Sequence, residues 1–286
     1  MLRTFLSVTA VLLAVPASAD ERRGSHVEVN GMQMYYDVSG AGEPLVVLHG
    51  SQMSIPSMGE ITDLLAESHK VYAVELQGHG RTTDIDRPIT YPNLAADVSA
   101  FMDAVGIEKA DVFGFSMGAI SGLRLAIDYP EKVDRLVFAS GVFDSNGWQP
   151  VYRDAIPNLE VDMFTSTFLA DEHRTLSGDP GAFPLLMEKL IVLQQEPMSW
   201  RTEVAALETP VLIIVGDSDG LNIEHSVEMF RLLGGGVMGD GAKELPASRL
   251  AVLPATSHTA LIGQADLMME FIEPFLKGEK PPGWFD

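Results

Sequence analysis

The chain contains a serine, an acid and a histidine in an order that suits nucleophilic catalysis. Ser116 is the centre of a G-F-S-M-G motif, with an apolar run at 110–116 and a helix-like run at 117–129 after it. A G-x-S-x-G motif between a strand and a helix is typical of a serine nucleophile held on a sharp turn, where its hydroxyl is exposed. The alternative interpretation is an ordinary strand-to-helix turn that contains a serine.

A catalytic serine needs a base, because its hydroxyl is a weak nucleophile at neutral pH. His258 follows one apolar run, and Asp217 and Asp219 follow another. Of the seven histidines, only His225 and His258 come after these acids, and His225 is too close to Asp219 to belong to a separate loop. We therefore expect His258 to be the base, with either aspartate as the acid that orients it.

Short apolar runs alternate with helical stretches along the chain. An Asn-Gly pair at 30–31 predicts an opening hairpin of two antiparallel strands. Six further strands are expected at 44–50, 70–78, 110–116, 133–140, 209–217 and 248–255, with helices between most of them, notably 93–106, 117–129 and 264–276. This alternation predicts an α/β fold with an eight-stranded, mostly parallel, doubly wound sheet.

The alternation breaks between Val142 and Leu207, where the sequence has no convincing strand but is rich in aromatic residues and methionine. We interpret 143–205 as a helical lid folded over the sheet edge, and 20–142 with 206–286 as the core. Insertions of this length are frequently active-site lids, although a packing subdomain without a functional role is the alternative. The glycine-rich run at 232–242 lacks a Lys-Ser/Thr pair, so we interpret it as a surface loop.

The first residues are typical of a secretory signal peptide. Arg3 precedes an apolar run that ends at Val15, and the sequence A-S-A before Asp20 predicts cleavage after Ala19. The apolar run, about a dozen residues long, is short for a membrane span, so we do not expect stable membrane insertion. These features predict an exported protein, either periplasmic or secreted.

Composition excludes several classes of protein. The formal net charge of −21 disfavours binding to nucleic acid or to anionic membranes. The absence of cysteine excludes a cysteine nucleophile and thiolate metal sites. The histidines are scattered without metalloprotease spacing, so we expect neither a metal nor a cofactor. Nothing in the sequence specifies an oligomeric state.

The motif, the strand pattern, the inserted segment and the serine-acid-histidine order together resemble the α/β-hydrolase superfamily, over essentially the whole mature chain. The resemblance implies that Asp219, the second aspartate of G-D-x-D, is the triad acid, whereas Asp217 caps the turn. The sequence L-H-G-S at 48–51 resembles the oxyanion loop of the family. This implies backbone N–H donors from Ser51 and Met117, with His49 as a structural residue.

The segment E-L-Q-G-H-G-R-T at 75–82 resembles the D-x-x-G-H-G-x-S loop of the family, with Glu75 and Thr82 as departures. We expect His79 and Arg81 to brace this loop. The serine at position 116 disfavours the haloalkane dehalogenase and epoxide hydrolase branches, which use a carboxylate there.

The expected activity is hydrolysis of a small to medium carboxylic ester through an acyl-enzyme on Ser116. The aromatic and methionine-rich lid suits a small-molecule substrate with an apolar part. The same triad is compatible with a lactone, an amide, a carbon–carbon bond beside a ketone, or perhydrolysis. A non-catalytic protein that binds a small ligand on the same fold is the third interpretation.

Overall fold

A computed structural model of the chain describes residues 23–179, 181–239 and 245–279. The predicted signal peptide at 1–19 lies outside these residues, as does part of the glycine-rich run at 232–242. Within the described ranges, no helix combines the length and the apolar character that a membrane crossing requires.

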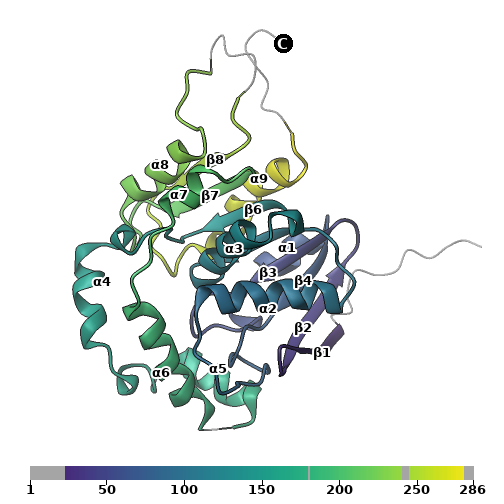
Figure 1. Ribbon diagram of the computed structural model, residues 1–286, viewed down its shortest axis with the longest axis vertical. Helices are drawn as coiled ribbons and strands as arrows, with labels where there is room; N and C mark the ends of the chain where they lie inside the picture. Colours follow the sequence, from purple (N-terminus) through teal and green to yellow (C-terminus); the bar gives the residue numbers. More distant parts are fainter. Residues whose placement is uncertain (1–22, 180, 240–244, 280–286) are drawn as a thin grey trace, which may run out of the picture.

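Eight strands form one sheet in the order β1-β2-β4-β3-β5-β6-β7-β8, and most of them are labelled in Figure 1. Strand β2 is antiparallel to both of its neighbours, and every other neighbouring pair is parallel. The predicted fold class is therefore confirmed. The strands are β1 (Arg23–Val29), β2 (Met32–Gly40), β3 (Pro44–Leu48), β4 (Lys70–Val74), β5 (Ala110–Phe115), β6 (Val133–Ala139), β7 (Val211–Gly216) and β8 (Arg249–Leu253).

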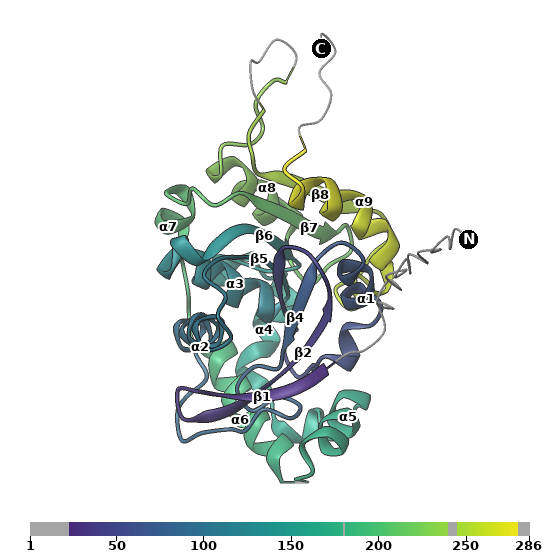
Figure 2. The same ribbon diagram turned by 90° about the vertical axis from the view of Figure 1, so that its right-hand side faces the viewer.

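Helices cover both faces of the sheet (Figures 1 and 2). Side chains of β3 alternate between the two faces: Val46 and Leu48 enter one apolar cluster, and Leu45 and Val47 enter the other. The first cluster includes residues of α2 (Tyr91–Ala104), α3 (Met117–Asp128) and α8 (Ile223–Leu232); the second includes residues of α1 (Ile61–Ala66) and α9 (Ala265–Leu276).

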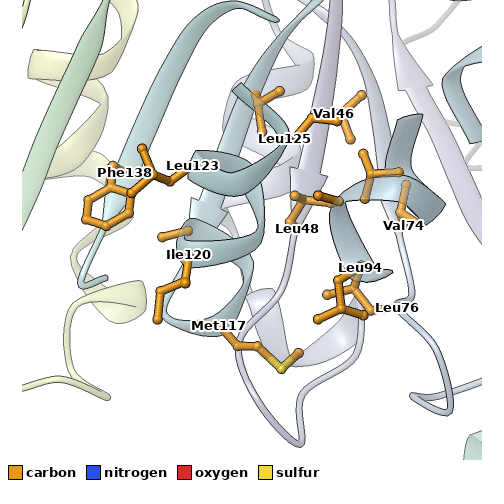
Figure 3. Close-up of a cluster of buried hydrophobic side chains, with 14 of the residues drawn as sticks. Val46, Leu48, Val74, Leu76, Leu94, Met117, Ile120, Leu123, Leu125 and Phe138 are labelled. Atoms are coloured by element: carbon orange, nitrogen blue, oxygen red, sulfur yellow. The ribbon is translucent and has the colours of Figure 1, made fainter. Parts of the chain in front are cut away.

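The larger cluster holds α3 against the centre of the sheet. Figure 3 shows Ile120 and Leu123 of α3 in the same group of side chains as Leu48 of β3 and Phe138 of β6. Each large apolar side chain buried in this way stabilises the fold by roughly 1.5–3 kcal/mol. The packing therefore holds the first turn of α3, directly after Ser116, against the strands.

The segment 143–205 is helical and lies mainly beside the sheet (Figure 1). Its α5 and α6 are attached to the core by polar contacts. Lys189 donates from Nζ to Oδ2 of Asp84 at 2.6 Å, and His173 donates from Nε2 to the carbonyl of Gly78 at 2.9 Å. The α-helices of the segment are α4 (Pro150–Ala155), α5 (Phe168–Ser177), α6 (Ala182–Gln195) and α7 (Arg201–Ala205), of which α7 packs on α8.

The six strands expected after the hairpin all end one to four residues earlier than the sequence indicates, and β4 by the most. The expected strands at 44–50 and 70–78 end at Leu48 and Val74. The residues that follow β3 and β4 lie in loops. The N–H of Glu75 still donates to the carbonyl of Tyr35 in β2 at 3.0 Å, whereas the N–H of Leu76 donates to Nε2 of His49. An apolar pattern extends through such residues because they are buried, although they are not part of a strand.

Asp111 is a buried carboxyl at the opposite end of β5 from Ser116. The residue is 7% exposed, and its Oδ1 has no hydrogen-bond partner among the described residues. Burial, with a contribution from the nearby charge of Asp134, raises the pKa of Asp111 to about 7. The folded chain therefore keeps a proton that the unfolded chain releases near its ordinary pKa of 3.8.

We expect Asp111→Asn to reduce the pH dependence of stability. Between pH 3.8 and about 7 the folded wild type binds more protons than the unfolded chain, so its free energy of unfolding falls as pH rises. Relative to wild type, the variant should gain stability from about pH 4 to about pH 8, by on the order of 1 kcal/mol or more. Urea unfolding measures this gain, and an equal difference at both pH values would contradict the raised pKa.

Candidate active site

Ser116 occupies a strained corner between β5 and α3. Its backbone has φ 53° and ψ −116°, a conformation that is uncommon for a residue with a side chain. Two hydrogen bonds hold it there: its N–H donates to the carbonyl of Ala139 at 2.8 Å, and its carbonyl accepts from the N–H of Ile120 at 3.0 Å. The corner is thus fixed by β6 on one side and by the first turn of α3 on the other.

The two glycines of the motif are required by close backbone contacts. A Cβ on Gly114 would lie 2.4 Å from the carbonyl oxygen of Gly118. A Cβ on Gly118 would lie 2.2 Å from the carbonyl oxygen of Leu48 and 2.6 Å from that of His49. Any side chain at these positions would push α3 away from β5 or from the loop after β3.

Ser116, His258 and Asp219 form a continuous chain of hydrogen bonds. Nε2 of His258 is 2.9 Å from Oγ of Ser116, and Nδ1 of His258 is 2.7 Å from Oδ1 of Asp219. The carboxylate can only accept, so Nδ1 carries a proton, and Nε2 of the neutral imidazole is left to accept the serine proton. The structure therefore brings together three residues that follow β5, β7 and β8, at the carboxyl ends of parallel strands.

The two candidate acids occupy different environments. Asp219 is 6% exposed, and its Oδ2 accepts from Oγ of Ser140 at 2.6 Å. Burial favours the protonated form of Asp219, but the hydrogen bonds from His258 and Ser140 outweigh it and lower its pKa below the ordinary value. Asp219 therefore stays ionised beside the imidazole.

Asp217 instead closes the loop that carries His258. Its carboxylate accepts from the backbone N–H of Ala255 at 2.9 Å and of Thr256 at 3.3 Å. The bond from Ala255 is the main reason that the pKa of Asp217 lies below its ordinary value. This is the capping role that the family resemblance implies for Asp217.

Ser140 is a site residue that sequence reasoning missed. It follows β6, is buried, and has φ 51°, the left-handed region that favours glycine. Its N–H donates to the carbonyl of Ile214 at 2.8 Å, which holds its hydroxyl against Asp219. The only signal in the sequence is a serine at the end of a predicted strand, and that pattern does not reveal a partner 79 residues away.

His225, the rejected alternative base, lies outside this chain of hydrogen bonds. Its ring stacks on that of Phe143 with centroids 4.1 Å apart, and its Nε2 accepts from the N–H of Phe143 at 3.2 Å. Burial lowers the pKa of His225 to about 4. These contacts attach α8 to Phe143, the first residue of segment 143–205.

Two donors to the carbonyl of Gly50 fix the orientation of the peptide that carries the N–H of Ser51. The carbonyl of Gly50 accepts from Nδ1 of His49 at 2.7 Å and from the N–H of Met53 at 3.2 Å. In a trans peptide the N–H points opposite to the carbonyl, so the N–H of Ser51 is directed away from these donors. Ser51 and Met117 both line the same cavity as Ser116. Met117 is the first residue of α3, where backbone N–H groups have no partner within the helix.

His49 and the loop at 75–82 brace this arrangement. Nε2 of His49 accepts from the N–H of Leu76 at 3.0 Å, and burial lowers the pKa of His49, which keeps it neutral. The buried carboxylate of Glu75 accepts from the guanidinium and from the N–H of Arg81. His79 is fully buried, with its Nδ1 2.9 Å from the carbonyl of Gln77.

A cavity of about 280 Å³ opens onto Ser116. Among the described residues, no Asp, Glu, Lys or Arg lines it. Tyr152 donates to Oε1 of Gln194 at 2.5 Å, which joins α4 to α6 at the cavity wall. The other lining residues are Gly50, Ser51, Gln52, Met53, Tyr91, Phe115, Met117, Ile120, Trp148, Leu169, Leu193, Gly220, His258 and Thr259.

Known proteins resemble this chain in sequence and in fold. A family model described as "alpha/beta hydrolase fold" matches residues 43–190. A pimeloyl-[acyl-carrier protein] methyl ester esterase from Xanthomonas campestris is 26% identical over 271 residues, covering 85% of this chain and 98% of that one. The dihydrolipoyllysine-residue acetyltransferase component of an acetoin cleaving system from Cupriavidus necator is 34% identical over 116 residues, which are 40% of this chain and only 31% of that protein.

Solved structures share the architecture at low sequence identity. The enol-lactonase from Burkholderia xenovorans LB400 matches with a TM-score of 0.68 at 19% identity, covering 88% of this chain and 100% of that one. This likeness shows the fold, whereas the family match covers more than half of the sequence. The chain belongs to the α/β-hydrolase fold family, and it is an α/β-fold hydrolase.

Substituting each aspartate by asparagine tests which of the two orients His258 during catalysis. Asp219→Asn keeps the shape but donates to Nδ1 of His258 and favours the wrong tautomer, so kcat should fall by about 10³–10⁴-fold. Asp217→Asn should lower kcat less than about 10-fold, because it disturbs only the loop that carries His258. Steady-state ester kinetics on both variants check this expectation, and the reverse order would assign the acid to Asp217.

Removal of the Ser140 hydroxyl should slow the reaction without preventing folding. In Ser140→Ala the pKa of Asp219 should rise and the imidazole should be less well oriented. We expect kcat/KM to fall by about 10-fold, because only part of the energy of a hydrogen bond to a charged group is lost in the transition state. Ser140→Gly is the matched control, since glycine suits φ 51° and also lacks the hydroxyl.

Both Ser140 variants should lose the same activity, while the glycine variant should be the more stable of the two in urea. Unchanged kcat/KM in either variant would show that Ser140 serves the fold alone.

Proposed function

We propose that the protein is a serine carboxylesterase that hydrolyses small to medium, uncharged esters through an acyl-enzyme on Ser116. The single observation that carries the proposal is the hydrogen-bond chain from Asp219 through His258 to Ser116, which ends at an apolar cavity. An activated serine needs this arrangement of nucleophile, base and orienting acid.

In the proposed reaction, Oγ of Ser116 attacks the ester carbonyl while Nε2 of His258 takes its proton. The carbonyl oxygen becomes an oxyanion, which the N–H groups of Ser51 and Met117 stabilise by about 3 kcal/mol per donor. The imidazolium, held by Asp219, gives the proton to the departing alkoxide, and the alcohol leaves. Water then attacks the acyl-enzyme with His258 as base, which releases the acid and restores Ser116.

The dimensions and chemistry of the cavity support a substrate of modest size. Its volume of about 280 Å³ lies just below the range of roughly 300–1,000 Å³ usual for small-molecule sites. Because its lining contains no Asp, Glu, Lys or Arg among the described residues, a charged group on the part of the substrate inside the cavity would lose hydration without gaining a carboxylate, ammonium or guanidinium partner. The apolar walls near Trp148 and Ile120 favour an aliphatic or aryl part.

A fluorophosphonate and a set of p-nitrophenyl esters test the proposal on the purified protein. The fluorophosphonate should add one adduct to the wild type and none to Ser116→Ala, because only an activated serine displaces fluoride. Esters from acetate to decanoate should give an optimum at short acyl chains, and Ser116→Ala should lose at least about 10³-fold in kcat. Intact mass and ester turnover give the two results.

The outcomes separate the proposal from its alternatives. Labelling without turnover of any ester would keep the activated serine and move the substrate to a lactone, an amide or a carbon–carbon bond beside a ketone. Absence of both labelling and turnover would contradict the proposed function and favour a ligand-binding protein, and full turnover by Ser116→Ala would exclude Ser116 as the nucleophile.

A further inference from the structure

A hydrogen-bonded pair of polar side chains lies in the wall of the cavity that opens onto Ser116. Tyr152 of α4 donates to Oε1 of Gln194 in α6 at 2.5 Å, and both residues line the cavity. Both are half-buried, and both belong to segment 143–205. The cavity thus contains polar groups that the proposed hydrolysis does not use.

The pair is close to the triad but is not part of it. The ring of Trp148 is 6.1 Å from that of His258 and 4.9 Å from that of Tyr152, measured between ring centroids. The hydrogen bonds of the His258 ring run to Ser116 and Asp219, so the pair takes no part in proton transfer. A substrate in the cavity can therefore meet the pair with atoms other than those of the scissile bond.

The contact with Tyr152 leaves hydrogen-bond donors of Gln194 unused. A glutamine side chain offers one carbonyl oxygen and two N–H donors. Because the phenol donates to the oxygen, the amide is fixed with its oxygen toward Tyr152, and neither N–H donor has an acceptor in the described part of the chain. Burial raises the pKa of Tyr152, so the phenol keeps the proton that it donates. The pair therefore offers N–H donors to a bound molecule and carries no formal charge.

The helices that carry the pair are attached to the core of the protein. The N–H of Gln149, the residue before α4, donates to the carbonyl of Gly220 at 2.8 Å. In α6, Lys189 binds the carboxylate of Asp84. Because the amide is already held in place before a ligand arrives, a hydrogen bond to it loses little free energy to the ordering of the side chain.

We propose that Gln194, oriented by Tyr152, donates a hydrogen bond to an uncharged oxygen of the substrate, a second carbonyl or an ether oxygen away from the scissile ester. This inference rests on the proposed function and narrows its substrate class to esters that carry such an oxygen. A carboxylate is disfavoured as the acceptor, because no Lys or Arg lines the cavity among the described residues. A purely aliphatic substrate would displace water from the amide and leave its donors unpaired, which costs free energy.

Two pairs of esters of equal chain length test the proposal on the purified protein. In the acyl part, p-nitrophenyl 5-oxohexanoate differs from p-nitrophenyl hexanoate by one carbonyl group. In the alcohol part, 5-oxohexyl acetate differs from hexyl acetate in the same way. The wild type should hydrolyse the oxo ester of at least one pair with a kcat/KM about 5-fold higher than the plain ester, the effect of one hydrogen bond between uncharged groups. The pair that shows the preference assigns the oxygen to the acyl or the alcohol part.

Variants of the two side chains connect this preference to the amide. Gln194→Leu keeps the approximate size of the side chain but removes both N–H donors, so the preference for the oxo ester should disappear. Tyr152→Phe keeps these donors and removes only the proton that orients the amide, so it should lose part of the preference. The double variant should match Gln194→Leu, because the two side chains act as one unit.

The ratio of kcat/KM between oxo and plain ester separates recognition from a structural role. If the pair only attaches α4 to α6, its loss slows the hydrolysis of both esters equally and the ratio stays at its wild-type value. Such a result, or equal kcat/KM for the two members of each pair in the wild type, would overturn the inference.

The experiment also separates this inference from the proposed function. If the fluorophosphonate labels Ser116 and simple esters are hydrolysed without preference for the oxo form, the recognition by Gln194 is excluded and the esterase proposal stands. If the wild type shows neither labelling nor ester turnover, the proposed function itself fails, and this inference fails with it.

Discussion

The contact between the first turn of α3 and the loop after β3 is the constraint on which the rest of the site depends. It exists because Gly118 has no side chain, so the carbonyls of Leu48 and His49 approach the helix more closely than any Cβ would permit. Strands β3 and β5 are adjacent and parallel, so both elements reach the same end of the sheet. The nucleophile and the loop that faces it are thus positioned by one steric requirement.

The acid and base are held by a second set of contacts that joins the ends of β6, β7 and β8. Ser140 binds Asp219, and Asp217 binds the backbone of the loop that carries His258. The same region continues into segment 143–205, because the N–H of Asn222 donates to the carbonyl of Gly147 at 2.7 Å. The orientation of the imidazole and the position of the cavity wall therefore depend on one connected group of loops.

Much of the fold could be predicted because its signals are local. Short continuous apolar runs predict buried strands, and the alternation with helices predicts a parallel sheet, whatever the distant sequence contains. The limits of β4 could not be predicted in this way. Glu75 to Gly78 continue the buried pattern, but beyond the bond from the N–H of Glu75 to Tyr35 of β2 their partners include Arg81 and His173 of α5, which lie far outside the local pattern.

The sequence by itself determined the types and order of the reactive residues and the strands that they follow, because a G-x-S-x-G turn and an apolar run are properties of neighbouring residues. Only the tertiary structure decided which aspartate meets His258, that Ser140 supports this acid, and that the buried Ser51 hydroxyl has no hydrogen-bond partner among the described residues. These are contacts, or missing contacts, between residues far apart in the chain. Periodicity carries no information about them, since they arise only when the loops at the carboxyl ends of separate strands are packed together.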